Sequence, residues 1–141
     1  TYNSWRPLRA IRGGADDGND STQADPLWQP FIATPAHPEY PSGHGTFSSS
    51  MAEVLERLFG GPDVPLSVVI FDSPSNTTIT RRWETFSEGV DEVIEARIYS
   101  GIHFRTADEV GARLGRHTAQ FVLTHALRPC HGRGSRACGG Q

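Results

Sequence analysis

Residues 41–44, with the sequence Pro-Ser-Gly-His, constrain the fold more than any other stretch because a helical apolar pattern begins directly after them. Pro41 favours the entry to a helix, and Ser42 is a suitable N-cap residue. The periodicity predicts a helix over residues 42–59, followed by a stop at Gly60. The apolar positions of this stripe are Phe47, Met51, Val54, Leu55, Leu58 and Phe59.

The mouth of this predicted helix is suited to a negatively charged ligand. Its first backbone N–H groups have no partner inside the helix, and the helix dipole adds positive potential, so a tetrahedral oxyanion is a natural guest. His44 lies three residues before Phe47 and seven before Met51. We therefore expect its imidazole on the same inward face, beside the anion, where it can transfer protons.

Length, charge and composition narrow the class of protein. A chain of 141 residues is long enough for one domain with a buried core. A hydrophobic fraction of 36% and a net charge of -3 are ordinary for a soluble protein, and the acidic balance argues against nucleic acid as the main partner. No apolar run approaches the length of a membrane span. Cys130 and Cys138 could form a disulfide or remain free thiols.

A long loop precedes the predicted helix, over residues 13–40. Loops of this length inside a compact domain are usually functional or poorly ordered. This one is rich in proline and carries Trp28, Phe31 and Tyr40, which we interpret as anchors. We therefore expect an ordered loop that wraps around a site.

Two further helices are predicted, each opened by a capping box. The first box is at residues 85–88 and its helix ends near Gly101; the second is at residues 106–109 and its helix ends near Leu127. Before the first of them, in the connection that follows the 42–59 helix, residues 67–71 could form one short strand. The inner side of the helix before Gly101 consists of Phe86, Val90, Val93 and then Arg97.

Arg97 is informative because it continues an apolar stripe, which points its guanidinium toward the interior, where an unpaired charge is costly. It could form an ion pair with a carboxylate such as Glu53 or Asp91, or it could be a bidentate clamp for an oxyanion. His103 follows six residues later, just past Gly101, where a turn can return the imidazole to the guanidinium.

The order and spacing of these residues predict one anion pocket. Arg6-Pro7 and the Pro-Ser-Gly-His stretch are each weak signals alone. Combined with Arg97 and His103, they supply two arginines, helix-mouth amides and two histidines for a tetrahedral anion. The remaining histidines are first interpreted as core or capping residues.

With these motifs the sequence resembles the vanadium-dependent haloperoxidases, which share their site design with type 2 phosphatidic acid phosphatases and bacterial acid phosphatases. The resemblance covers residues 1–127. It is carried by Trp5-Arg6-Pro7, Ala10-Ile11-Arg12, Asp25-Pro26, Thr34-Pro35, residues 37–44 and residues 97–104.

The resemblance implies a role for each site residue. His103 would bond vanadium, or attack phosphorus in a phosphatase, and His44 would be the acid–base partner. His37 would line the halide side of the pocket, where histidine goes with bromide oxidation. The oxygens of the anion would be held by Arg6, Arg97, Ser42 and the amide of Gly43.

The implied protein is a soluble bacterial enzyme, secreted or periplasmic, with vanadate as cofactor and phosphate as its mimic. Its partners would be hydrogen peroxide, a halide and a small organic acceptor, and a homo-oligomer is a possible assembly. The implied fold is an all-α helix bundle with long ordered loops over residues 1–128, followed by a Gly- and Arg-rich disordered tail over residues 129–141. The chain would be the C-terminal part of a longer protein.

Two departures from the family pattern keep alternatives open. The family's motif lysine would precede Thr1, and the aspartate four residues after the phosphatase histidine is Ala107 here, with Asp108 one residue late. The alternatives are a phosphatase that works through a phosphohistidine on the same site, and a non-catalytic anion-binding remnant.

Overall fold

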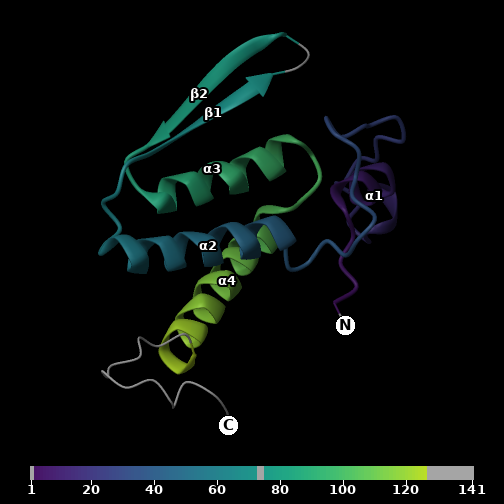
Figure 1. Ribbon diagram of the computed structural model, residues 1–141. Coiled ribbons are helices and arrows are strands. Elements are labelled where there is room, and N and C mark those ends of the chain that lie inside the picture. Colours follow the sequence, from purple (N-terminus) through teal and green to yellow (C-terminus); the bar gives the residue numbers. More distant parts are fainter. Residues whose placement is uncertain (1, 73–74, 127–141) are drawn as a thin grey trace, which may run out of the picture.

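A computed structural model describes residues 2–72 and 75–126 of the chain. Its body consists of α2 (Gly43–Phe59), α3 (Phe86–Tyr99) and α4 (Arg105–His125). In Figure 1, α2 and α3 run side by side and α4 crosses α2 near the N-terminal end of that helix. None of the described helices is long and apolar enough to cross a membrane.

The contact between α2 and α4 is built from small residues. A Cβ atom added to Gly111 would lie 2.5 Å from the carbonyl oxygen of Ser42, and one added to Gly45 would lie 2.6 Å from that of Asp108. Such distances leave room only for hydrogen, so the two backbones meet directly. We call this contact the small-residue seam. Its buried members are Gly45, Ser49, Ala52, Asp108, Gly111, Ala112, Gly115 and Ala119.

The remaining face of α2 differs from the sequence prediction. The apolar stripe that was expected to point inward is largely exposed: Phe47 is 66% and Leu58 is 72% accessible. Of that stripe, Leu55 packs on the core and the ring of the exposed Phe59 stacks on that of the core residue Phe86, with centroids 6.3 Å apart. The prediction was wrong because large apolar side chains cannot enter a seam in which the helix backbones touch.

The apolar core lies between α3 and the other two helices. Phe86, Val90 and Ile94 project from α3 onto Ala52 and Ala112. The predicted capping box starts α3, because the Thr85 hydroxyl accepts from the backbone N–H of Glu88 at 3.1 Å. The helix is followed by Gly101 in a left-handed conformation, with φ of 72°.

A β-hairpin corrects the all-α prediction. Strands β1 (Leu66–Asp72) and β2 (Thr77–Trp83) pair antiparallel, with Leu66 opposite Trp83 and Asp72 opposite Thr77. The hairpin lies beside α3 and projects from the helical body (Figure 1). Its residues are mostly exposed on both faces, so alternating β-branched and aromatic residues form strands here without a core face. The chain is therefore mainly helical rather than all-α.

The N-terminal segment folds back onto the turn between α3 and α4. It contains α1 (Pro7–Arg12) and the single 3₁₀ turn Gly14–Asp16. Arg12 Nε donates to the Trp28 carbonyl at 2.8 Å, and the backbone N–H of Phe31 donates to the Ser100 carbonyl at 3.0 Å.

The aromatic residues of this loop do not all act as predicted. The Trp28 ring lies against Gly101, where an added Cβ would approach it to 2.9 Å. Phe31, in contrast, is 89% exposed, so the loop is held there by its backbone and not by the ring. The loop is ordered through contacts that its proline and aromatic content did not specify.

The start of α4 does not use its predicted capping box. The helix begins at Arg105 with Phe104 as N-cap, and no side chain of its own caps it. Instead, the carboxylate of Glu39 accepts from the backbone N–H of Phe104 at 3.0 Å. The helix ends at His125. The predicted end at Leu127, the cysteine pair and the predicted tail over residues 129–141 lie outside the described residues.

Candidate anion-binding site

Arg6 joins the start of the chain to the turn before α4. Its Nη1 donates to the Ile102 carbonyl at 2.7 Å and lies 3.1 Å from Nε2 of His103. Its Nη2 donates to the carbonyl oxygens of His37 at 2.8 Å and Pro38 at 3.2 Å. One guanidinium thus contacts both His37 and His103, whose ring centroids are 6.4 Å apart.

His103 is a buried, neutral imidazole. It is 2% exposed, and its Nδ1 lies 3.4 Å from Oε1 of Glu39. Burial is the main cause that lowers the pKa of His103 to about 4, and the negative charge of Asp108 opposes the shift. The positive charges that lower it further are those of Arg6, Arg97 and His37. Near neutral pH the ring is therefore uncharged, with one nitrogen lone pair available.

Arg97, in the last turn of α3, is only partly paired. Its Nε and Nη2 atoms are buried and have no hydrogen-bond partner among the described residues. Burial lowers its pKa, and the charge of Asp108 opposes that shift. The alternative ion pair with Glu53 or Asp91 is not made within the described chain, and Glu53 pairs with Arg57 at 3.4 Å.

Asp108 is the carboxylate whose negative charge acts on Arg97, and it lies in the first turn of α4. It is fully buried, and neither oxygen makes a hydrogen bond of ordinary geometry within the described part of the protein. Burial raises its pKa, while the Ser42 hydroxyl and the charges of His103 and Arg97 lower it. From the first turn of α4, Asp108 therefore balances part of the positive charge of the site.

The N-terminus of α2 supplies the third part of the site. Ser42 is fully buried, and its hydroxyl oxygen accepts from the backbone N–H of Gly45 at 3.3 Å, as an N-cap does. Its own N–H donates to the Ala107 carbonyl at 2.9 Å, which fixes the helix mouth on α4. Gly43 is exposed at the first turn of the helix.

His44 is also exposed and does not point inward with the apolar stripe as predicted. It still lies within electrostatic range of the other residues. Partial desolvation lowers its pKa first, and the charges of Arg97 and His37 add to that shift. The imidazole is thus accessible to solvent in the first turn of α2.

The site has more hydrogen-bond donors than acceptors. Nε of Arg6 and both unpartnered nitrogens of Arg97 are buried donors, and leaving such donors unsatisfied is costly. An oxyanion would supply acceptors for them, so these residues fit vanadate or phosphate. In the part of the chain that the structure describes, no group of three or more His, Cys, Asp or Glu residues is arranged to hold a metal cation.

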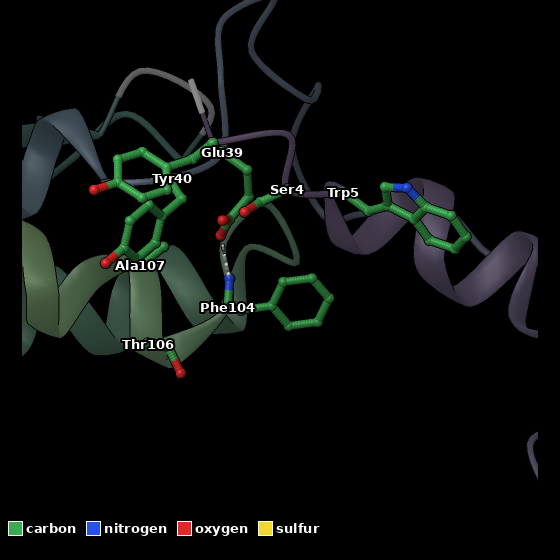
Figure 2. Close-up of a pocket in the computed structure, with 8 residues that line it drawn as sticks. Ser4, Trp5, Glu39, Tyr40, Phe104, Thr106 and Ala107 are labelled. Carbon is green, nitrogen blue, oxygen red and sulfur yellow. Dashed lines mark hydrogen bonds between the residues drawn. The ribbon is translucent and has the colours of Figure 1, made fainter. Parts of the chain in front are cut away.

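A pocket of about 520 Å³ lies between the N-terminal segment and the start of α4 (Figure 2). In Figure 2 the Glu39 side chain points toward the backbone N–H of Phe104, and the rings of Tyr40 and Phe104 line the same pocket. None of the predicted site residues lines it. The pocket therefore adjoins the buried Glu39 carboxylate and not the arginine pair.

Sequence reasoning missed two parts of this arrangement. Glu39 lies within the 37–44 motif, but its local sequence carries no signal for a contact with His103. The small-residue seam is the second part, although Gly111 and Gly115 fall four residues apart on one side of a helix. That spacing is a detectable signal for close helix contact.

Comparison with known proteins identifies what the chain resembles. Residues 1–132 match the family model of the VCPO second helical-bundle domain. The vanadium chloroperoxidase of Curvularia inaequalis is 26% identical, in an alignment that covers 74% of this chain and 24% of the relative.

Two solved structures share the fold. The first bacterial vanadium-dependent iodoperoxidase superposes with a TM-score of 0.63 at 33% identity, over 83% of this chain and 26% of that chain. A holo-type bacterial vanadium-dependent chloroperoxidase superposes with a TM-score of 0.64 at 19% identity, over 82% of this chain and 28% of that chain. The chain spans about a quarter of the length of each of these relatives.

Proposed function

This chain belongs to the vanadium-dependent haloperoxidase family, and from that premise we propose that it carries the vanadate site of an enzyme that oxidises a halide with hydrogen peroxide. The observation that carries the proposal is that Nε and Nη2 of Arg97 are buried and unpartnered among the described residues, while the charge of Arg97 acts on both Arg6 and His103. The proposed domain spans residues 1–128.

Each part of the site has a proposed task. Arg6, Arg97, Ser42 and the Gly43 amide would hold the vanadate oxygens, and the neutral imidazole of His103 would bond vanadium through Nε2. When bound, vanadate would supply Lewis-acid activation of the peroxide without a change of oxidation state. The arginines provide the fixed positive charge that this requires.

The two exposed histidines would act around this centre. His44 has a lowered pKa, so near neutral pH it can accept a proton from a ligand at the helix mouth and return it. His37 contacts the same arginine as His103, which supports a position on the halide side of the pocket. We propose bromide as the preferred halide because an imidazole there can donate a hydrogen bond to it.

Titration of the full chain with orthovanadate and with phosphate tests the proposal. We expect His103→Ala to weaken vanadate binding at least about tenfold and phosphate binding much less, because only vanadate would bond the imidazole. His117→Ala, on the exposed side of α4, is the matched histidine control and should change neither. Equal vanadate affinity in the His103 variant and the parent chain would contradict the role of His103.

Halide preference is tested by halogenation of monochlorodimedone by the vanadate-loaded full chain with bromide, chloride and iodide. Faster turnover with chloride than with bromide would refute the assignment of His37. Vanadate binding without turnover of any halide would favour the non-catalytic alternative for this chain.

A phosphatase remains the second candidate because of the state of His103. A neutral imidazole with a free nitrogen beside an arginine is also suited to attack phosphorus. Vanadate and phosphate are alike in shape and charge, so the same residues would hold either. Hydrolysis of p-nitrophenyl phosphate without halide turnover would favour the phosphatase.

A further inference from the structure

Glu39 is a buried carboxylate to which neither the sequence pattern nor the proposed chemistry assigns a role. It is 3% exposed and lies in the loop before α2. Its Oε1 atom lies 3.4 Å from Nδ1 of His103 and accepts from the backbone N–H of Phe104 at 3.0 Å. A single oxygen of Glu39 therefore reaches both the imidazole and the N-cap of α4.

The imidazole also contacts a group that can only donate. Nη1 of Arg6 lies 3.1 Å from Nε2 of His103 and 3.4 Å from Nδ1. A guanidinium has no acceptor, so the ring nitrogen it contacts must offer a lone pair. The shorter contact is to Nε2, and Nδ1 faces a carboxylate, which accepts a proton. The two contacts agree on one tautomer, with hydrogen on Nδ1 and the lone pair on Nε2.

We propose that Glu39 is a positioning residue that holds the His103 ring in the Nδ1–H tautomer, so that the Nε2 lone pair faces Arg6 and the anion that this arginine would bind. The proposal rests on the proposed function only for the identity of that anion. Asp108, the other buried carboxylate near the ring, acts on it through charge and makes no hydrogen bond to it in the described structure. Ala107 has no side-chain acceptor at all.

The competing explanation is that Glu39 is only a cap for α4 through the Phe104 N–H. Two substitutions, one that keeps both contacts of Glu39 and one that removes both, prepare the measurements that separate the explanations. Glu39→Gln keeps a carbonyl oxygen that the Phe104 N–H holds in place, so it can still accept from Nδ1 of His103. Glu39→Met fills a similar volume without a strong acceptor and removes both contacts.

The direct measurement is ¹⁵N NMR of the His103 ring in the full chain without any anion. We expect the Nδ1–H tautomer in the parent chain and in Glu39→Gln, and a mixture of tautomers in Glu39→Met. The Nε2–H tautomer in the parent chain would overturn the proposal without reference to any variant. An unchanged Nδ1–H tautomer in a folded Glu39→Met variant would also overturn it.

Vanadate titration provides the second readout. We expect Glu39→Met to weaken vanadate binding by about 10- to 100-fold, as the loss of a partner that orients a ligand does, and Glu39→Gln to stay within about threefold of the parent chain. Glu53→Met is the matched control, because Glu53 is also a buried glutamate but pairs with Arg57 on α2. It should leave vanadate affinity unchanged even if it lowers stability.

A double-mutant cycle with His103→Ala distinguishes positioning from capping. If Glu39 acts through the imidazole, Glu39→Met should have almost no further effect on vanadate binding once His103 is alanine. The same fold-loss in both backgrounds would identify a cap and overturn the proposal. Should the parent chain not bind vanadate, the proposed function fails, while the NMR tautomer of the anion-free protein still decides the role of Glu39.

Discussion

The two faces of α2 differ in burial, and the difference is opposite to that expected of an amphipathic helix, whose large apolar residues are usually buried. One face presents Gly45, Ser49 and Ala52 to α4 and is buried. The other presents large apolar side chains such as Phe47 and Leu58 and is exposed in this chain. A stripe of large apolar residues therefore did not mark the face that positions the site.

The position of the α2 N-terminus depends more on how closely the α2 and α4 backbones approach each other than on the burial of large apolar side chains. Because the backbones meet along the seam, Ser42 can donate its N–H to the Ala107 carbonyl and its side chain can lie beside Asp108. Bulky residues at the seam would separate the helices by several ångströms. The anion site is then expected to depend on glycines that do not touch the anion.

The largest expected effect comes from filling the seam. Gly115 packs directly against the Thr46 carbonyl and the Ser49 hydroxyl, so Gly115→Val should destabilise the protein by about 3 kcal/mol in urea unfolding. It should also weaken vanadate binding, because α2 must move. Gly89→Ala is the control: Gly89 lies inside α3 with only an ordinary contact at 3.8 Å, and alanine there should stabilise by about 0.5–1 kcal/mol. Equal losses in both variants would refute close backbone contact as the cause.

The second effect is a pH dependence of the free energy of unfolding that comes from His103. The pKa of His103 is lowered from 6.5 to about 4 in the folded protein, so between these values the unfolded chain binds more protons. Stability contributed by this group is therefore present above pH 6.5 and is lost as pH falls toward 4. The slope is at most about 1.4 kcal/mol per pH unit.

The contribution of His103 is isolated by comparing urea unfolding of the parent chain and His103→Gln from pH 4 to pH 7. The difference in unfolding free energy should shift in favour of the parent chain as pH rises through this window. A difference that stays constant over the window would mean that His103 titrates alike in both states.

A smaller effect is expected from one hydrogen bond across the seam. The buried Ser49 hydroxyl donates to the Ala112 carbonyl at 2.7 Å, so Ser49→Ala should cost about 1 kcal/mol. Ser50→Ala is the matched control, since the neighbouring hydroxyl donates only to the Phe47 carbonyl within its own helix. Chemical denaturation of the two variants should separate them, and an equal cost would argue against a bond between the helices.

The smallest effect is expected on the opposite face of α2. Phe47→Gln and Leu58→Gln replace exposed side chains, so each should change the unfolding free energy of this chain by no more than about 0.5 kcal/mol. Losses above about 2 kcal/mol would show that this face is covered in solution, and would end the contrast between the two faces of the helix.

Local signals in the sequence predicted the helix ends well. The Ser42 N-cap, the box at Thr85 and the left-handed glycine at Gly101 depend on backbone groups only a few residues away, and all three form. The box at Thr106 does not form, because the start of that helix depends on a residue far away in the sequence. The carboxylate of Glu39, which is distant in the sequence, accepts from the N–H of Phe104. The helix therefore begins at Arg105, before the predicted box.

The sequence alone determined the family, the mainly helical character and the residues available to hold an oxyanion, because short motifs and helical periodicity are local properties. It did not determine which face of α2 is buried, the hairpin at residues 66–83, or the partner of His103. Those were decided by tertiary structure: Gly111 and Gly115, 69 and 73 residues after Ser42, set how closely α4 approaches, and Glu39 meets His103 only after the loop closes over the turn before α4. Contacts between residues so far apart depend on how the whole chain packs, and a local pattern such as the glycine spacing in α4 can indicate a close contact but not its partner.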